Sequence, residues 1–403
     1  MLSVDEALAR VLAAVTPLAG ESMPLAAASG RVLQAPVTAS HSQPPFDASA
    51  MDGYAVRAED VVPGTPLRLV GTAQAGQRFS GMVNPGQCVR IFTGAPLPIG
   101  TDSVVIQEEA TADGNAISFA KAIPPGHFVR RRGSVFAEGA TLLPAGLPLT
   151  PARLALAAAA NRAEVTVTRR PRIAILSSGD ELVRPGTPLG PDQIVSANNY
   201  GLAALFAGAG AGAEIVDLGI VADDLPALVD TLAAALDSGI DMLVTSGGAS
   251  VGNRDFTQEA LKALGVGLDF WQIALRPGKP MMFGKSGETL VFGLPGNPVS
   301  ALVTATVFGL PALRRLNGQS DTAGLRLTLP LAAALPPNGE RQHFLRGVFE
   351  PAPGGTRIMP LAETDSGHIA SLAAADALIV QPEHDPGQPA GSMVDVIPLQ
   401  LWA

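Results

Sequence analysis

The order of hydrophobic and polar residues alternates short apolar runs with helical stretches between residues 172 and 316. The apolar runs are Arg172–Gly179, Glu214–Val221, Asp241–Gly248 and Leu290–Leu294, and the helical stretches are Asn199–Ala209, Asp224–Leu236, Asp255–Leu264 and a helix from Pro298 onward. Near-continuous apolar strands joined by helices are typical of a parallel sheet that is covered on both faces. This segment is therefore predicted to be a doubly wound, parallel-sheet α/β domain.

The flanking segments are rich in β-branched and turn-forming residues. They predict strands at Leu67–Thr72, Gln87–Thr93 and Ser103–Glu109, and again at Leu325–Leu329, His343–Glu350, Ala377–Gln381 and Ser392–Leu399. Helical patterns at residues 3–15 and 151–160 bracket the first β-rich region, so we expect these two helices to pack together while that region protrudes. The predicted domains are a helical linking domain (1–19 and 140–170), a β-rich inserted domain (20–139), the α/β domain (171–316) and a C-terminal β domain (317–403).

Composition narrows the class of protein. With 403 residues, 47% of them hydrophobic, the chain is long enough for several folded domains. Its 27 basic and 36 acidic residues give a net charge of −9, which argues against unspecific binding to nucleic acid or to an anionic membrane. The single cysteine, Cys88, rules out an intrachain disulfide, and the five scattered histidines do not have zinc-ligand spacing. We expect a cytoplasmic protein, since the first 15 residues do not form a signal peptide.

Unusual short motifs follow the predicted α/β strands. They are Ser177–Glu181, Asp223–Asp224, Ser246–Gly252 and Pro295–Pro298. Ligands of open α/β sheets bind outside the carboxyl ends of the strands, so these loops predict a binding site.

The loop Ser246–Gly252 is rich in glycine and joins a strand to a helix. The backbone amides of Gly247, Gly248 and Gly252 and the hydroxyl groups of Ser246 and Ser250 are suited to hold a phosphate at the start of that helix. A plain strand-to-helix turn explains the same residues equally well.

Four acidic residues come from successive loops of this sheet edge: Glu181, Asp223, Asp224 and Asp255. Carboxylates gathered in one place repel each other unless a cation lies between them, and Mg²⁺ bound by carboxylates and substrate phosphates fits this pattern. The alternative is that these residues are helix N-caps, which is the stronger reading for Asp224.

Arg276 and Lys279 lie on a proline-bounded turn ahead of the next strand. Such a turn pre-positions both charges and suits an oxyanion, although a solvated surface turn is the alternative. Arg346 is a further cation whose place the sequence leaves open. In the inserted region, the loops that hold Asp52 and Thr93 are explained by local turn structure as well as by a site.

Six motifs, in this order and spacing, resemble the molybdopterin molybdenumtransferase family, which includes the gephyrin E domain. They are Asp47–Tyr54, Arg90–Pro96, Ser178–Leu182, Ser246–Gly252, Pro277–Pro280 and Leu294–Pro298, and the resemblance spans essentially the whole chain. It implies an elongated homodimer of four-domain subunits. It also implies Mg²⁺-dependent insertion of molybdate into adenylylated molybdopterin, which releases AMP and forms molybdenum cofactor.

Site residues are implied by matching these motifs. Asp52 and Thr93 match site residues of the protruding domain, where the family dimer implies that they serve the partner's cleft. The acidic group matches Glu181, Asp223 or Asp224, and Asp255; the molybdate and pterin contacts match Arg276, Lys279, Pro280, Pro295, Asn297, Arg346 and Ser366. The segment Arg132–Val135 departs from the family pattern of glycine followed by two acids.

Two other functions compete with this reading. A molybdopterin adenylyltransferase shares the α/β domain but needs only the central part of this chain. A non-catalytic molybdopterin-binding or scaffolding protein is a second possibility, which the presence of both Asp52 and Glu181 disfavours. Expected partners beyond the substrates are a molybdopterin adenylyltransferase and molybdoenzyme maturation factors.

Overall fold

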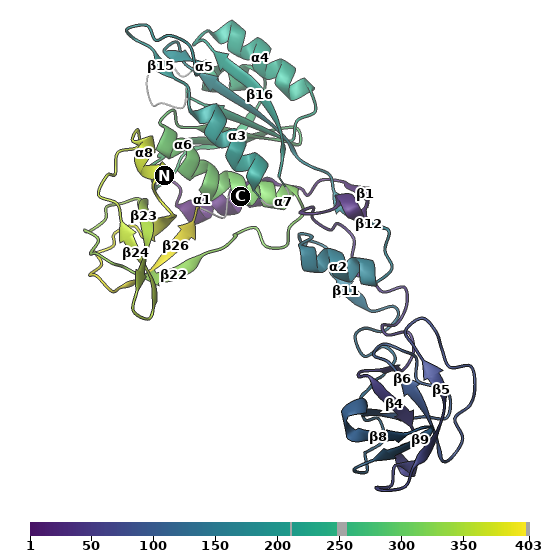
Figure 1. Ribbon diagram of the computed structural model, residues 1–403. Helices are drawn as coiled ribbons and strands as arrows, with labels where there is room; N and C mark the ends of the chain where they lie inside the picture. Colours follow the sequence, from purple (N-terminus) through teal and green to yellow (C-terminus); the bar gives the residue numbers. More distant parts are fainter. Residues whose placement is uncertain (210–211, 248–255, 400–403) are drawn as a thin grey trace.

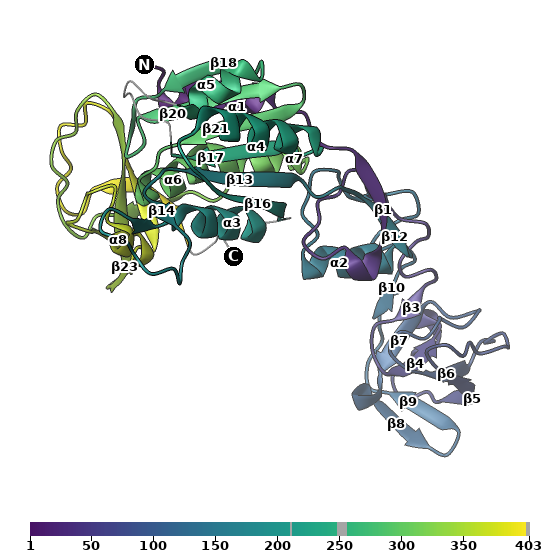
Figure 2. The same cartoon turned by 90° about the horizontal axis from the view of Figure 1, so that it is seen from above.

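A computed structural model describes residues 1–209, 212–247 and 256–399 of the chain. The molecule is elongated. A β-rich domain stands well away from the central α/β domain, at the end of an arm that two segments of the chain form (Figures 1 and 2). The described residues include three sheets of six strands, one in each of the distal, central and C-terminal parts.

The central sheet has the strand order β16-β13-β17-β21-β20-β18. Its strands are β13 (Arg172–Ser178), β16 (Glu214–Val221), β17 (Met242–Ser246), β18 (Gly267–Gln272), β20 (Pro280–Ser286) and β21 (Thr289–Leu294). The four strands from β16 to β21 are parallel, as the sequence predicts. The other two are antiparallel additions that the sequence pattern does not predict: β20 pairs with β21, and β18 with β20.

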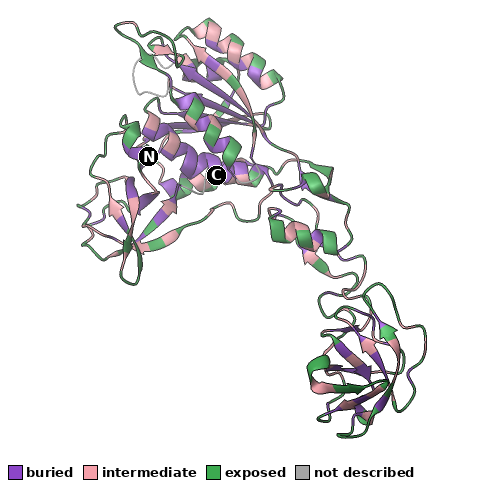
Figure 3. Cartoon of the chain, viewed as in Figure 1, coloured by how far each residue is buried: buried purple, intermediate pink, exposed green. Residues whose placement is uncertain are grey.

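Helices cover both faces of the central sheet, which confirms the doubly wound arrangement. One face packs against α1 (Val4–Ala14), α3 (Asn198–Gly208), α6 (Pro298–Thr304), the π-helical turn η4 (Ala305–Gly309) and α7 (Leu310–Leu316). The other packs against α4 (Leu225–Asp237) and α5 (Phe256–Ala263). Figure 3 shows buried residues concentrated in this sheet and in the helices beneath it.

The continuous helical segment Pro298–Leu316 is long and apolar enough to cross a membrane by length and composition alone. However, 83% of its most apolar window is buried inside the protein, so it serves as a core helix. Its Leu313 and Phe308 side chains are fully buried among those of the central domain.

The two helices that flank the β-rich region do not pack together, so that expectation is wrong. Helix α1 begins at a capping box formed by Ser3 and Glu6, and its buried face (Val4, Ala7, Val11) joins the core of the central domain. Helix α2 (Pro151–Ala159) instead packs in a small separate core with η1 (Leu25–Ala27), β1 (Gly20–Pro24) and β12 (Glu164–Thr168). Each apolar face is buried by the nearest complementary surface, and helical periodicity does not specify which surface that is.

The distal domain is a six-stranded sheet of order β7-β4-β6-β5-β9-β8 with a core on each face. Its strands are β4 (Gly53–Val56), β5 (Leu67–Ala73), β6 (Gln87–Ile91), β7 (Ser103–Ile106), β8 (Ala110–Asp113) and β9 (Ala116–Phe119), with 3₁₀ turns η2 (Ala58–Asp60) and η3 (Gln107–Glu109). The arm is held by the pairs β2 (Val37–Thr38) with β11 (Thr141–Leu143) and β3 (Ala48–Ser49) with β10 (Val129–Arg130). The three strands predicted here are present, and the third is cut short by η3.

The C-terminal sheet has the order β19-β23-β25-β26-β22, with β24 paired to β23. Its elements are β22 (Leu327–Pro330), β23 (Gln342–Ala352), β24 (Gly355–Pro360), β25 (Ala377–Gln381) and β26 (Met393–Pro398), with helix α8 (Ile369–Ala373). Strand β19 (Leu275–Arg276) comes from the α/β segment of the chain and pairs with β23. The central and C-terminal domains are therefore joined at the point where the chain leaves β19 for β20.

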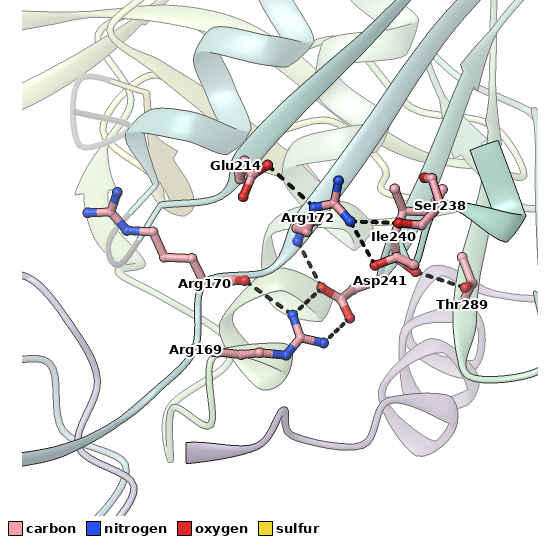
Figure 4. Close-up of polar contacts among 9 residues, drawn as sticks. Arg169, Arg170, Arg172, Glu214, Ser238, Ile240, Asp241 and Thr289 are labelled. Carbon is pink, nitrogen blue, oxygen red and sulfur yellow. Dashed lines mark hydrogen bonds and ion pairs between the residues drawn. The ribbon is translucent and has the colours of Figure 1, made fainter. Parts of the chain in front are cut away.

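A buried carboxylate fixes the amino-terminal edge of the central sheet (Figure 4). Both oxygens of Asp241 accept from the guanidinium of Arg169, at 2.8 and 2.5 Å, and one also accepts from the backbone N–H of Arg172 at 2.8 Å. Thr289 Oγ1 donates to the backbone oxygen of Ile240 at 2.9 Å. These bonds tie the linker before β13 to the starts of β17 and β21.

Candidate functional site

A cavity of about 770 Å³ opens at the carboxyl edge of the central sheet, where the sequence predicts a site. The loops after β13, β16, β17 and β21 line it, together with the β19–β20 turn and a C-terminal loop at residues 364–366. The predicted residues that line it are Glu181, Asp223, Ser246, Gly247, Arg276, Lys279, Pro280, Pro295, Asn297 and Ser366.

The remaining predicted site residues are not among those that the structure shows at the cavity. Gly248, Ser250, Gly252 and Asp255 fall outside the described residues. Asp52 and Thr93 belong to the distal domain, and Asp224 and Arg346 are not among the residues that line the cavity.

The acidic wall of the cavity comes from the loops after β13 and β16. Burial, together with the carboxylates of Asp180 and Glu181, raises the pKa of Asp223. Asp180 also accepts from the backbone N–H of Asp223 at 3.0 Å, which holds the two loops together. This wall is therefore a cluster of carboxylates that no described arginine or lysine neutralises through an ion pair.

Asp224, for which the sequence favours a helix cap over a metal ligand, caps helix α4. Its side chain accepts from the backbone N–H of Ala227 at 3.0 Å, as an N-cap does. Within the described ranges, no group of three histidine, cysteine, aspartate or glutamate side chains is placed to hold a metal ion. The two carboxylates of Glu181 and Asp223 suit the way Mg²⁺ is usually held, by one or two carboxylates and by substrate phosphate oxygens.

The cationic wall comes from the turn between β19 and β20, which carries Arg276 and Lys279. Because β20 runs antiparallel to β21, its first residue lies at the edge where β21 ends, and this brings the turn to the carboxyl edge of the parallel strands. Gly278 has φ +117°, and a Cβ at that position would overlap Thr304 of α6. Glycine thus allows the turn to pack against α6 while both cationic side chains line the cavity.

Arg346 does not line the cavity but stabilises one of the loops that do. Its side chain is 4% exposed and donates to the backbone oxygen of Asp365 at 2.9 Å and to that of Glu363. It thereby holds the loop that presents Ser366 to the cavity. In the same loop, Ser366 Oγ accepts from Asn297 Nδ2 at 2.8 Å, and its backbone oxygen accepts from the N–H of Val299 at 3.1 Å.

Arg341 and Asn198 are among the residues of the cavity wall that the sequence-based set lacks. Arg341 lines the cavity just before β23, and a cation directly ahead of a strand is the only signal that marks it. Asn198 donates through Nδ2 to Ser246 Oγ and to the backbone oxygen of Gly296, each at 2.7 Å. Asn198 thus braces the loops after β17 and β21 against each other, a role that only their spatial proximity reveals.

Asp52 and Thr93 lie together in the distal domain and are not among the residues that line the cavity. That domain stands well away from the central domain (Figure 1). Asp52 Oδ1 accepts from the backbone N–H of Thr93 at 2.8 Å and from its hydroxyl at 2.7 Å. These two bonds, the backbone one first, hold the pKa of Asp52 below its usual range. Both residues are exposed and the Asp52 carboxylate is ionised at neutral pH, so the pair is available to a second molecule.

Cys88 takes no part in either location. It is fully buried in the distal domain, and burial raises the pKa of its thiol to about 12, so it is not a thiolate nucleophile at neutral pH.

Three protein families match successive parts of the chain. Residues 2–161 match the family described as MoeA N-terminal region (domain I and II), and residues 174–315 match the probable molybdopterin binding domain. Residues 328–399 match the MoeA C-terminal region (domain IV). The cavity lies mainly in the second of these regions and takes its 364–366 loop from the third.

Curated relatives match along nearly the whole chain. The molybdopterin molybdenumtransferase of Nostoc sp. is 37% identical over 391 residues, which cover 94% of this chain and 88% of the relative. Molybdopterin molybdenumtransferase 2 of Mycobacterium tuberculosis is 36% identical, with 100% and 99% covered. A crystal structure of a molybdopterin biosynthesis MoeA protein from Pyrococcus horikosii has a TM-score of 0.83 at 30% identity and covers 98% of each chain.

Proposed function

The chain belongs to the molybdopterin molybdenumtransferase family, and on this basis we propose that it inserts molybdate into adenylylated molybdopterin, releasing AMP and forming molybdenum cofactor. One structural observation carries the proposal. The cavity at the carboxyl edge of the sheet has carboxylates on one wall and cations on another. This charge separation suits two substrates, one that carries metal-bound phosphate groups and one that is a small dianion.

Arg276 and Lys279 bind the molybdate dianion in this mechanism. Charge-assisted donors replace the water that solvates the anion and orient its oxygens toward the adenylate. Ser366, held by Asn297 and by the Arg346-supported loop, supplies a neutral hydrogen-bonding group at the same wall. Ser246 and Gly247, braced by Asn198, form part of the substrate-binding floor between the walls.

Glu181 and Asp223 would hold Mg²⁺ in this mechanism. The ion would supply Lewis-acid stabilisation of negative charge on phosphate oxygens. The raised pKa of Asp223 fits this role, because a cation relieves the repulsion between Asp223, Asp180 and Glu181.

A homodimer is the second part of the proposal, since Asp52 and Thr93 do not line the cavity and their domain stands well away from the central domain (Figure 1). In a symmetric dimer, the exposed pair serves the cavity of the partner. Subunits with Asp52→Ala, mixed with subunits carrying Glu181→Gln, should regain activity through heterodimers that hold one intact site. Mixtures no more active than either variant would contradict the shared site.

The location and partners form the last part of the proposal. A cytoplasmic protein suits the buried placement of the apolar segment Pro298–Leu316. We also propose contacts with a molybdopterin adenylyltransferase, which would deliver the adenylylated substrate, and with molybdoenzyme maturation factors, which would receive the product.

Turnover of adenylylated molybdopterin with molybdate is the deciding experiment. Release of AMP that depends on molybdate supports the transferase, and formation of the adenylate from molybdopterin and ATP would instead show an adenylyltransferase. Binding of molybdopterin without either reaction would show a scaffolding protein. The match to all three family regions favours the first outcome, because an adenylyltransferase needs only the central one.

A further inference from the structure

Two neighbouring cavities share the same three cationic residues. The main cavity and a second one of about 340 Å³ are both lined by Arg276, Lys279 and Arg341. Arg341 is a half-buried side chain at the start of the C-terminal sheet, and the other two lie on the β19–β20 turn. The boundary between the cavities is therefore a cluster of three positive charges.

None of the three cations forms an ion pair with a carboxylate of the described part of the chain. Ion pairs elsewhere in the molecule engage other basic side chains, for example Arg131 with Asp47 and Lys121 with Glu109. Glu340, next to Arg341 in sequence, lines the second cavity but forms no ion pair with it. Like charges that line one cavity repel each other, and a bound anion relieves this repulsion.

The backbone holds Arg341 next to the turn that carries the other two cations. Its carbonyl oxygen accepts from Asn338 Nδ2 at 2.8 Å. The N–H of the next residue, Gln342, donates to the backbone oxygen of Ala274 at 2.9 Å, and Gln342 pairs with Leu275 across β19 and β23. Arg341 is thus positioned before any ligand arrives, and the entropic cost of binding is lower.

His343 reports the positive potential in this region. It pairs with Arg276 across β19 and β23, and its side chain is buried. Burial, followed by the charges of Arg276, Arg346 and Arg341, lowers the pKa of His343 to about 4. The imidazole is therefore neutral at physiological pH, and the positive charge of the cluster comes from the arginines and Lys279.

We infer that Arg341 is a third anion-binding residue of this site, beside Arg276 and Lys279. The inference rests on the proposed function and adds a residue to it. Arg346, by contrast, donates hydrogen bonds from its guanidinium to the backbone oxygens of Glu363 and Asp365 and acts as a positioning residue for their loop. Two oxyanions fit the chemistry of the cluster: molybdate and the phosphate of the adenylate.

Calorimetric titration of the full-length protein with molybdate, and separately with AMP, tests this inference. Arg341→Gln removes the charge and should raise the dissociation constant for one of the two anions by about tenfold or more, the loss expected for a charge-assisted contact. Arg341→Lys keeps the charge without the fork of donors and should fall between parent and Arg341→Gln. Arg68→Gln, at an exposed position on β5, changes the net charge equally and should bind both anions as the parent does.

The pattern of results identifies the anion or overturns the assignment. Weaker binding of molybdate alone assigns Arg341 to molybdate, and weaker binding of AMP alone assigns it to the phosphate group. If Arg341→Gln binds both anions within about twofold of Arg68→Gln, Arg341 is not a ligand. A parent protein that binds neither anion would contradict the proposed function itself, which separates the two failures.

Arg346→Gln provides a structural comparison in the same assay. It leaves two carbonyl oxygens without their buried donor, so it should lower the melting temperature, whereas Arg341→Gln should melt with the parent. Should Arg341→Gln melt as low as Arg346→Gln, its guanidinium would have a structural role and the inference would be wrong.

Discussion

Replacing Lys279 by alanine tests whether the turn between β19 and β20 binds molybdate or only contributes general positive charge. Lys279 is half-buried at the cavity wall, and its ammonium group forms no ion pair with the described carboxylates. Its backbone oxygen accepts from the N–H of Ile273 at 3.2 Å, a bond that alanine retains. The variant should therefore fold as the parent does and lose only the charge that faces the cavity.

The size of the effect follows from the burial of this side chain. A hydrogen bond to a charged group contributes about 1.5–3 kcal/mol. Because Lys279 is only partly buried and Arg276 remains beside it, the lower half of that range applies, about 1.5–2 kcal/mol. Since 1.4 kcal/mol is a factor of ten, the molybdate concentration needed for half-maximal transfer should rise by about 10- to 30-fold. Binding of adenylylated molybdopterin should change less.

The assay is a molybdate titration of transfer activity, with Lys121→Ala as the control. Lys121 lies in the distal domain, outside every motif, and pairs on the surface with Glu109. Arg276→Lys should have a mild effect, because it keeps the charge on the same turn. If Lys279→Ala shifts the titration no more than Lys121→Ala does, the turn has only a structural role and the reasoning is refuted.

Three further predictions concern the carboxylates. Glu181→Gln should keep the fold but slow Mg²⁺-dependent AMP release by at least about tenfold, because a neutral amide is a poor ligand for a hard cation; turnover equal to that of the parent would remove the metal role. Asp223→Asn should raise the melting temperature at pH 7, because folding raises the pKa of Asp223 and its ionised carboxylate therefore destabilises the folded protein at pH values above the ordinary pKa of 3.8. The gain should vanish below pH 3.8, where the carboxyl group is protonated in both the folded and the unfolded state, and a gain that persists at pH 3 would contradict this origin. Asp241→Asn should lower the free energy of unfolding by about 2–3 kcal/mol and the melting temperature by about 4–12 °C, since the amide cannot accept from Arg169 and Arg172 as the carboxylate does (Figure 4). An unchanged melting curve would show that this network contributes little to stability.

Local patterns in the sequence determined most of the elements and the place of the site. The strands β13, β16, β17 and β21 and the helices between them follow from apolar runs and helical periodicity, which depend on neighbouring residues alone. The carboxyl ends of parallel strands share one edge, so the order of the strands along the chain is enough to bring the loops with Glu181, Asp223 and Ser246 together. Whether each of these residues acts as predicted stays a prediction.

Tertiary structure decided which side chains face the cavity. The direction of β20, the pairing of β19 with β23 and the burial of α1 against α7 all depend on contacts between distant parts of the chain. The pattern of apolar residues in a strand does not specify in which direction the strand runs in the sheet or with which strand it pairs. For the same reason the sequence leaves two readings open for Asp224 and the place of Arg346 undecided. The fold uses the first as a helix cap and the second to support a loop. Arg341 reaches the cavity only because the C-terminal sheet takes in β19, which brings together two segments that lie about 65 residues apart in the chain.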